Sequence, residues 1–311
     1  IMKAIKFFAI SAMAAAMITS CSTDDELSQS NYPSDNIIRV TAGVNNAKTR
    51  ADGAGTEMKN DFSLTIVNKN TEKPELASKY SYTDKVFSKK SGDWACSETL
   101  LWQNDKTPVD IVAFAPAQEG KFNGVYANGS IQPITYSVAT DQSTLSDYND
   151  LLYYYTPGFV PGGTNLDKDG KLSIQFNHAF CMIDINVTLG TEFNKPEVLD
   201  NSPIVKVTLG GTKIAANVDV KNAATGSTTT TASVVTASEE ATPTTITTTK
   251  GSFTKAANAE ANAISRFSCI TIPQTVAANT FKVSLMTAGK RYEWTSDKEI
   301  TLQSGYRYTL N

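Results

Sequence analysis

Apolar and polar residues alternate in short runs along the chain after residue 36, and no segment there shows a sustained helical period. An alternation with a period of two residues is typical of strands that bury one face. In residues 180–188, the clearest case, Cys181, Ile183, Ile185 and Val187 share one parity. The runs that predict strands lie at residues 37–44, 62–68, 109–115, 131–138, 151–155, 172–176, 180–188, 204–209, 213–220, 268–272, 280–286, 291–294, 299–302 and 306–310. Many short strands at regular spacing predict an all-β fold built from β-sandwiches.

Turn residues between these runs predict how neighbouring strands connect. Asn123-Gly124 and Asn128-Gly129 are typical of hairpin turns. Gly210-Gly211 separates two of the runs and predicts a hairpin between them. Residues 222–250 are rich in threonine, so we expect exposed edge strands that end in a long loop. A hydroxyl-rich loop without strands is the alternative for this segment.

The strongest interruption of the pattern is at residues 157–171, which contain two prolines, several glycines and the turn signal Asp169-Gly170. A composition of this kind is typical of a domain boundary. We therefore predict two β-sandwich domains in tandem, at residues 37–162 and 163–311.

The first 20 residues have the order of a secretory signal peptide. Lys3 and Lys6 precede an apolar stretch at residues 7–17, which is too short to span a bilayer as a helix. The stretch leads into Ile18-Thr19-Ser20-Cys21, which resembles the lipobox of bacterial lipoproteins. That resemblance implies that Cys21 carries the lipid and becomes the mature N-terminus. A cleaved signal peptide followed by an unrelated cysteine is the alternative.

Residues 21–36 follow as an acidic tether that is rich in Ser, Asp and Asn. Its beginning, Ser22-Thr23-Asp24-Asp25-Glu26, resembles the acidic export signal of Bacteroidetes surface lipoproteins. A solvated charged linker with no further role is the alternative.

Composition and charge exclude several classes of function. The net charge is -3, from 28 Lys+Arg and 31 Asp+Glu, so we expect no nucleic-acid partner. His178 is the one histidine, and neither a GxSxG elbow nor a phosphate-binding glycine loop is present. Cys96, Cys181 and Cys269 are odd in number without Cys21 and form no CxxC pair. We therefore predict a protein that is not an enzyme and that uses no metal and no cofactor.

Several weak motifs occur along the chain in the same order as in the fimbrillin (Mfa-like) family of Bacteroidetes pilus subunits, which the sequence therefore resembles. After the lipobox they are Thr49-Arg50-Ala51, Trp94, Leu101-Trp102, residues 109–116, Asp150-Leu151-Leu152-Tyr153, residues 172–179, Ile272-Pro273-Gln274-Thr275 and Gly305-Tyr306-Arg307-Tyr308. The resemblance covers residues 18–311. It implies two transthyretin-like β-sandwich domains, export as a lipoprotein, and cleavage by an Arg-specific protease between Arg50 and Ala51.

Such a cleavage implies assembly by strand exchange. Removal of residues 37–50 exposes unpaired backbone groups and an apolar groove, which a strand from another subunit fills. Ile38, Val40 and Ala42 share one parity and are the expected groove-facing residues. The resemblance implies an outer-membrane lipid anchor before processing, other pilus subunits as partners afterwards, and a location in a cell-surface fimbrium. A ligand on host or bacterial surfaces is a further expected partner.

Alternatives to a stalk subunit remain open at this stage. The sequence ends at Asn311 within a predicted strand, which fits either a truncated sequence or a tip-type subunit that accepts a strand without donating one. A glycan-binding surface lipoprotein would use exposed aromatic residues to stack on sugars. The candidates for that role are Trp94, Trp102, Tyr153, Tyr154 and Tyr155. A surface hydrolase would need clustered carboxylates in a cleft.

Overall fold

The computed structural model describes residues 30–45, 56–144, 149–190, 201–223, 233–257 and 261–311. Within these ranges strands dominate, which confirms the all-β prediction. The described helical segments are short: α1 (Pro74–Lys79), η1 (Asn123–Val125) and η4 (Val220–Ala223). None of the described helices is long and apolar enough to cross a membrane.

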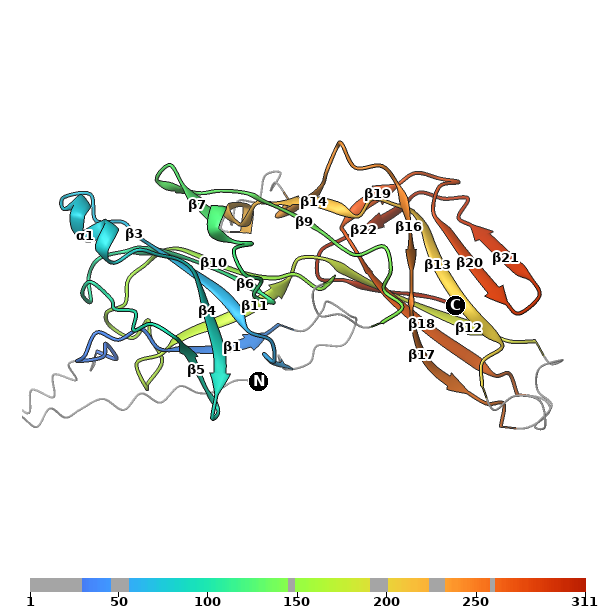
Figure 1. The fold of residues 1–311 in the computed structure, drawn as a ribbon, viewed down its shortest axis with the longest axis horizontal. Helices are drawn as coiled ribbons and strands as arrows, with labels where there is room; N and C mark the ends of the chain where they lie inside the picture. Colours follow the sequence, from blue (N-terminus) through green and yellow to red (C-terminus); the bar gives the residue numbers. More distant parts are fainter. Residues whose placement is uncertain (1–29, 46–55, 145–148, 191–200, 224–232, 258–260) are drawn as a thin grey trace, which may run out of the picture.

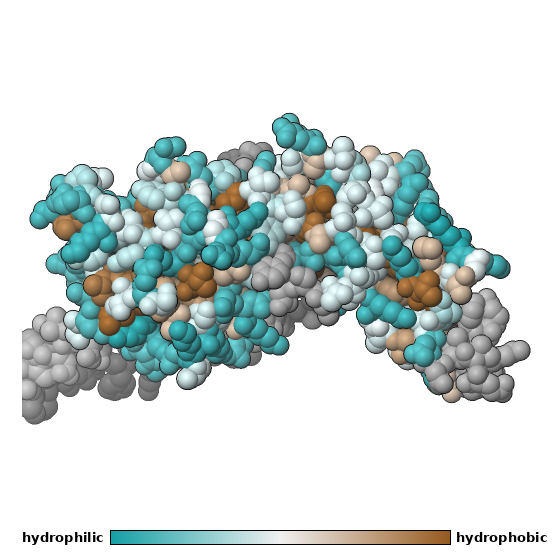
Figure 2. All heavy atoms as spheres, viewed as in Figure 1, coloured by the Kyte–Doolittle hydropathy of each residue, from teal (hydrophilic) through white to brown (hydrophobic). Residues whose placement is uncertain are grey.

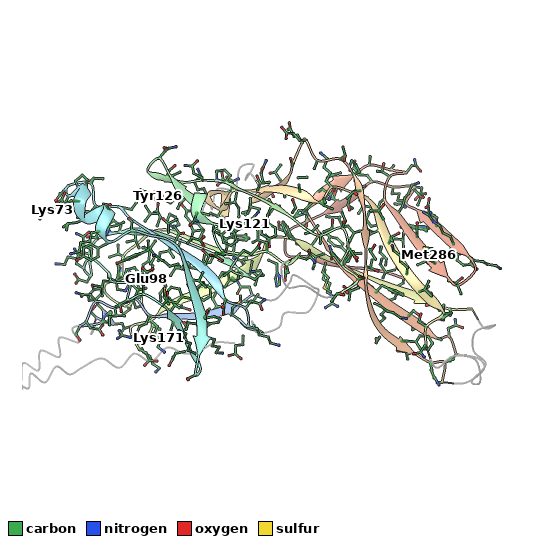
Figure 3. The ribbon with its side chains drawn as sticks, viewed as in Figure 1. Lys73, Glu98, Lys121, Tyr126, Lys171 and Met286 are labelled. Carbon is green, nitrogen blue, oxygen red and sulfur yellow. The ribbon has the colours of Figure 1, made fainter. Side chains whose placement is uncertain are left out.

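An eight-stranded sheet forms one end of the molecule (Figure 1). Its strands, in spatial order, are β2 (Thr56–Glu57), β1 (Val40–Val44), β11 (Leu172–His178), β10 (Leu152–Phe159), β6 (Val109–Ala115), β3 (Phe62–Asn68), β4 (Tyr82–Lys90) and β5 (Asp93–Cys96). The two ends of this sheet approach each other, because β1 contacts β5 and Glu57 forms an ion pair with Lys89. Lys171, just before β11, also reaches Asp93 of β5 at 2.9 Å (Figure 3).

The inside of this curled sheet is a continuous apolar core, which we call the N-terminal core. It includes Ile38, Val40, Val44, Met58, Phe62, Leu64, Ile66, Phe87, Leu100, Trp102, Val109, Ile111, Ala113, Leu172, Ile174 and Phe176. The strands β3 and β6 are buried at every position, because their other face is also covered. Val67, Val112 and Phe114 on that face join a second core.

Two four-stranded sheets form the other end of the molecule (Figure 1). One contains β17 (Thr249–Thr254), β18 (Ile264–Thr271), β12 (Cys181–Thr188) and β23 (Arg307–Leu310), in that order. The other contains β16 (Thr244–Thr247), β13 (Ile204–Thr212), β20 (Lys282–Thr287) and β21 (Arg291–Thr295). The visible face of the molecule is mostly hydrophilic, with brown apolar patches that remain separate (Figure 2).

Three smaller sheets connect these parts. They are β15 (Val235–Ala237), β14 (Ala215–Val218) and β9 (Ile134–Ser137); β19 (Gln274–Val276) with β22 (Ile300–Leu302); and β7 (Tyr126–Ala127) with β8 (Ser130–Ile131). Because β9 pairs with β14, residues before 160 and after 200 share one sheet. The second core likewise contains Phe114 and Phe122 together with Val218 and Val220, so apolar packing is continuous between the two ends of the molecule.

The structure corrects the boundary predicted at residues 157–171. The strand β11 pairs with β10 and with β1, so this segment joins two strands of one sheet. By strand pairing, the eight-stranded sheet ends at His178 and not at residue 162. The Asp169-Gly170 turn itself is present, since the Asp167 carboxylate accepts backbone N–H bonds from Asp169 and Lys171 at 2.9 and 2.8 Å.

Two of the predicted hairpins are wrong. The strands on either side of Gly210-Gly211 belong to different sheets, since β13 pairs with β16 and β20 whereas β14 pairs with β9 and β15. Gly211 has a φ of 87°, and a Cβ there would lie 2.1 Å from the Thr280 carbonyl oxygen, so its glycine serves a close backbone approach. Asn123-Gly124 lies in η1, whereas Asn128-Gly129 does form the β7–β8 hairpin.

Candidate strand-exchange site

The strand β1 is held along its whole length by one neighbour. It pairs in parallel with β11, in the register Val40↔Leu172 to Val44↔Phe176. On its other side, β2 pairs with Gly43 and Val44 alone. Parallel pairs are slightly less stable per residue than antiparallel ones, so the main pairing of β1 is of the weaker kind.

The core-facing side chains of β1 and the residues before it fill the N-terminal core. Ile38, Val40 and Val44 are 5%, 3% and 7% exposed, and Ala42 is half-buried against the same core. Ile38, Val40 and Ala42, named from the sequence, therefore lie on the core side, while their role in strand exchange stays a prediction. Val44 has the same parity and was missed as a site residue, although its place in the same run gave the signal.

Backbone hydrogen bonds extend the attachment beyond β1 itself. Leu172 N–H donates to the Arg39 carbonyl at 2.8 Å, and Asn45 N–H donates to Phe176 at 2.8 Å. Before β1, Ile38 N–H donates to the Leu100 carbonyl at 2.9 Å. These bonds tie both ends of the segment to elements that a cut after residue 50 leaves in place.

Polar side chains add little to this attachment. Arg39 donates two hydrogen bonds to Asp35, four residues earlier in the same segment, and this bonding lowers the pKa of Asp35 to about 2. Both partners are exposed, so the pair contributes little to stability. The Asn45 side chain donates to the Asn177 side-chain oxygen at 2.9 Å, at the end of the paired region. Apolar burial and backbone hydrogen bonding are therefore the main interactions that an exchanged strand has to replace.

The wall opposite β1 is aromatic. Phe62, fully buried on β3, packs edge-on against Phe176 with ring centroids 5.4 Å apart and against Trp94 at 5.0 Å. It stacks on Phe87 at 5.4 Å. Leu172, Ile174 and Phe176 face the core from β11, directly beside the core-facing positions of β1. Without β1, these side chains would line an apolar groove.

The proposed processing residues lie outside the described residues. Arg50 and Ala51 fall in the connection between Asn45 and Thr56, and Cys21 precedes residue 30. The described strands still fix where that connection starts and ends. Since β1 and β2 pair antiparallel, the connection is the link of a β1–β2 hairpin.

The sole histidine lies at the end of the strand that pairs with β1. His178 Nδ1 donates to the Asp150 carboxylate at 2.9 Å, and the imidazole is 22% exposed. Burial lowers the pKa of His178, but the hydrogen bond and charge of Asp150, together with the Asn45 backbone, outweigh it and raise the pKa overall. The geometry is that of a structural ion pair.

We expect this pair to make folding stability depend on pH. A raised folded-state pKa gives a stabilisation that is fully present below the unfolded-state pKa of about 6.5 and is lost as the pH rises through the folded-state value. Urea unfolding of the wild type at pH values from 5.5 to 8.5, sampled at about half-unit steps, should therefore show a stability that falls with rising pH. Hydrogen bonds to charged groups contribute about 1.5–3 kcal/mol, which bounds the change. His178→Gln and Asp150→Asn each remove one partner of the pair and should each reduce the slope; an unchanged slope in both would contradict the assignment.

The aromatic residues considered for sugar stacking do not form a surface site. Trp102 and Tyr153 are 2% and 9% exposed, and burial raises the pKa of Tyr153. Trp94 packs on Phe62, and Tyr154 and Tyr155 pack against different cores. Among the described residues, no group of three or more His, Cys, Asp or Glu side chains is placed to hold a metal ion.

Comparison with known proteins gives a family. A family model described as fimbrillin-like matches residues 49–311. Among solved structures, a candidate cell adhesion protein of Bacteroides ovatus aligns with a TM-score of 0.56 and 16% identity, over 88% of this chain and 90% of that chain. A similar protein of Bacteroides uniformis aligns with a TM-score of 0.52 and 14% identity, over 89% and 92%. No curated protein matches the chain. The family match covers most of the sequence, and the chain belongs to the fimbrillin-like family.

Proposed function

We propose that the chain is a structural subunit or tip adhesin of a cell-surface fimbrium and that it assembles by exchange of β1. The observation that carries the proposal is the position of β1. Its core-facing side chains complete the N-terminal core, yet it has one full-length neighbour, and the bond after Arg50 lies in the link that follows it. Membership of the fimbrillin-like family supports the same role.

The route to the fimbrium begins with a lipid on Cys21, which anchors the precursor in the outer membrane. An Arg-specific protease then cuts between Arg50 and Ala51, and residues 37–50 are released from a fold of two transthyretin-like β-sandwiches. The subunit carries out no catalysis and needs no cofactor, because the exchanged strand supplies both the backbone pairing and the apolar side chains. Its partners are other fimbrial subunits and a ligand on host or bacterial surfaces.

Cleavage makes exchange thermodynamically accessible. In the intact precursor β1 is covalently tethered, so its effective concentration at the groove is high and a strand from another subunit competes poorly. After the cut, β1 is held by noncovalent contacts alone: backbone pairing with β11 and β2, the hydrogen bond between Ile38 and Leu100, and apolar burial. An incoming strand with the same alternation gains equivalent contacts by β-augmentation.

Treating the purified precursor with an Arg-specific protease should give a new N-terminus at Ala51 and convert monomers into multimers. N-terminal sequencing, size-exclusion chromatography and electron microscopy measure these outcomes. Arg50→Lys should prevent both. The matched control is Arg39→Lys, since Arg39 lies in paired backbone and should not be the site of cutting. A different N-terminus, or multimers formed equally by Arg50→Lys, would contradict the proposal.

A further inference from the structure

A second concave feature lies among the elements that follow residue 200, apart from β1. It is a groove of about 1080 Å³ between β15, β19 and the segment that links β22 to β23, in the upper part of the view in Figure 1. This volume is slightly above the range for ligand pockets, about 300–1,000 Å³. All its lining residues lie between Gly211 and Tyr306, so neither β1 nor the N-terminal core contributes to it.

The accessible side chains of this groove are both polar and apolar. Thr236 on β15, Thr275 on β19 and Gln303 after β22 are exposed and line it. Of the apolar lining residues, Val235, Val276 and Leu302 are 2–3% exposed and form the floor, whereas Pro243 and Ala277 are exposed. The groove therefore offers hydroxyl and amide groups beside small apolar surfaces, as the polar edges and apolar faces of a sugar ring require.

The walls of the groove are fixed by one side chain. Gln274 accepts a hydrogen bond from Lys213 N–H at 2.8 Å and donates to the carbonyls of Lys213 and Ile272 at 3.0 and 3.1 Å. These bonds join the segment before β14 to β19, and both Lys213 and Gln274 line the groove. A ligand would meet a surface that is already organised, which reduces the entropic cost of binding.

One polar atom in the wall has no hydrogen-bond partner among the described residues. It is the hydroxyl of Ser304, which lines the groove and is buried. A buried hydroxyl without a partner costs free energy, so rotation of the Ser304 side chain towards a ligand in the groove would recover that cost.

The charges of the described lining residues favour an uncharged ligand. Lys213 is the one charged residue among its lining residues, and its Nζ donates to the carbonyls of Ser238 and Glu239 at 2.9 and 3.5 Å. Because the lining contains no carboxylate, a cationic ligand would lack a partner, and an anionic one would have to displace the lysine from its carbonyl bonds. The groove therefore matches a neutral polar ligand.

We propose that this groove binds a neutral oligosaccharide. Hydroxyl and amide groups both donate and accept hydrogen bonds, as sugar hydroxyls require. Tyr306 at the rim, whose ring lies 6.2 Å from that of Tyr308, offers an amphipathic aromatic surface for a sugar ring. An extended peptide fits less well, since strand addition takes its specificity from pockets for alternate side chains and the apolar floor is closed. The inference deepens the adhesive role proposed above and does not depend on strand exchange.

The test is binding of the full chain to an array of neutral oligosaccharides with terminal mannose, galactose, N-acetylglucosamine or fucose, beside sialylated and sulfated ones. The double variant Thr236→Val, Thr275→Val removes two exposed hydroxyls and keeps the branched side-chain shape. We expect the wild type to bind neutral glycans, and the double variant to bind them at least about tenfold more weakly. Thr245→Val is the matched control, because Thr245 is an exposed threonine of β16 outside the groove, and it should bind as the wild type does.

Three results would overturn the inference: no binding to any neutral glycan, a preference for the sialylated or sulfated ones, or equal binding by the double variant. Thermal unfolding of all variants checks that the substitutions leave the fold intact. The same double variant should still form multimers after protease treatment. Failure of the wild type to assemble would count against strand exchange alone, whereas loss of glycan binding would count against the groove alone.

Discussion

A chain that begins at Ala51 is expected to lose most of its folding stability and to regain it when a synthetic peptide of residues 36–45 is added. The side chains of Ile38, Val40 and Val44 are nearly fully buried, and burial of each contributes about 1.5–3 kcal/mol. Together they contribute about 5–9 kcal/mol, which is comparable to the whole stability of a typical domain at about 5–15 kcal/mol. The peptide should restore stability by mass action, by about 2.7 kcal/mol at 100 times its Kd.

Urea unfolding with and without the peptide measures both effects. A chain that begins at Ser30 is the control for the truncation, because it keeps β1 and loses only the residues before the described region. A peptide with Ser at positions 38, 40 and 44 should not rescue, whereas one changed at Arg39 and Thr41 should, since those two alternate with the core-facing set. Equal stability of the chains that begin at Ser30 and Ala51 would show that β1 is dispensable.

Phe62→Ala is expected to lower the free energy of unfolding by about 3–5 kcal/mol, the usual cost of deleting a buried phenylalanine. Phe62 is fully buried, and its ring contacts those of Phe87, Trp94 and Phe176. Since Phe176 pairs with Val44, the cavity would open beside β1. The substitution should therefore also weaken binding of the peptide of residues 36–45 to a chain that begins at Ala51.

Denaturant unfolding and peptide titration test the two parts separately. Phe62→Leu fills more of the site and should cost less on both measures. Leu209→Ala is a matched control for location, because Leu209 is fully buried in the second core. It should reduce stability and leave peptide affinity unchanged. If Leu209→Ala weakens the peptide as much as Phe62→Ala does, the groove is not a local feature of the N-terminal core.

Strands with a strong apolar signal could be predicted from the sequence to within a residue or two. The runs at 62–68 and 109–115 match the bounds of β3 and β6, which are buried on both faces and therefore nearly continuous in apolar residues. The strands β4 and β5 were missed, because they lie at the sheet end. Phe87 is the one fully buried residue of β4, and charged residues occupy much of the remainder.

The pairing of the strands could not be predicted in the same way. Local turn residues suggested a hairpin at Gly210-Gly211 and a boundary at residues 157–171, but pairing is set by packing between distant segments. Gly211 is required by the close approach of the Thr280 backbone, which lies far away in the sequence.

The same difference between local and long-range features applies to the two candidate sites. The core-facing parity of Ile38, Val40 and Ala42 could be predicted, because alternation within one strand is a local property. The polar groove could not, because residues from β15, β19 and the segment after β22 meet there only in the folded chain. The aromatic residues that were predicted to bind sugars instead pack in or against the two apolar cores.

The parallel pairing of β1 with β11 also has a consequence for the order of folding. Asn45 and Asn177, whose side chains bond at the end of this pairing, are 132 residues apart. Contacts of such long sequence separation raise the contact order and form slowly, because a long loop must close first. During synthesis the β1 segment emerges long before its partner strand. It is therefore the first strand of the sheet to be synthesised and among the last to pair. During that interval it is an unpaired strand to which strands of other chains can bind.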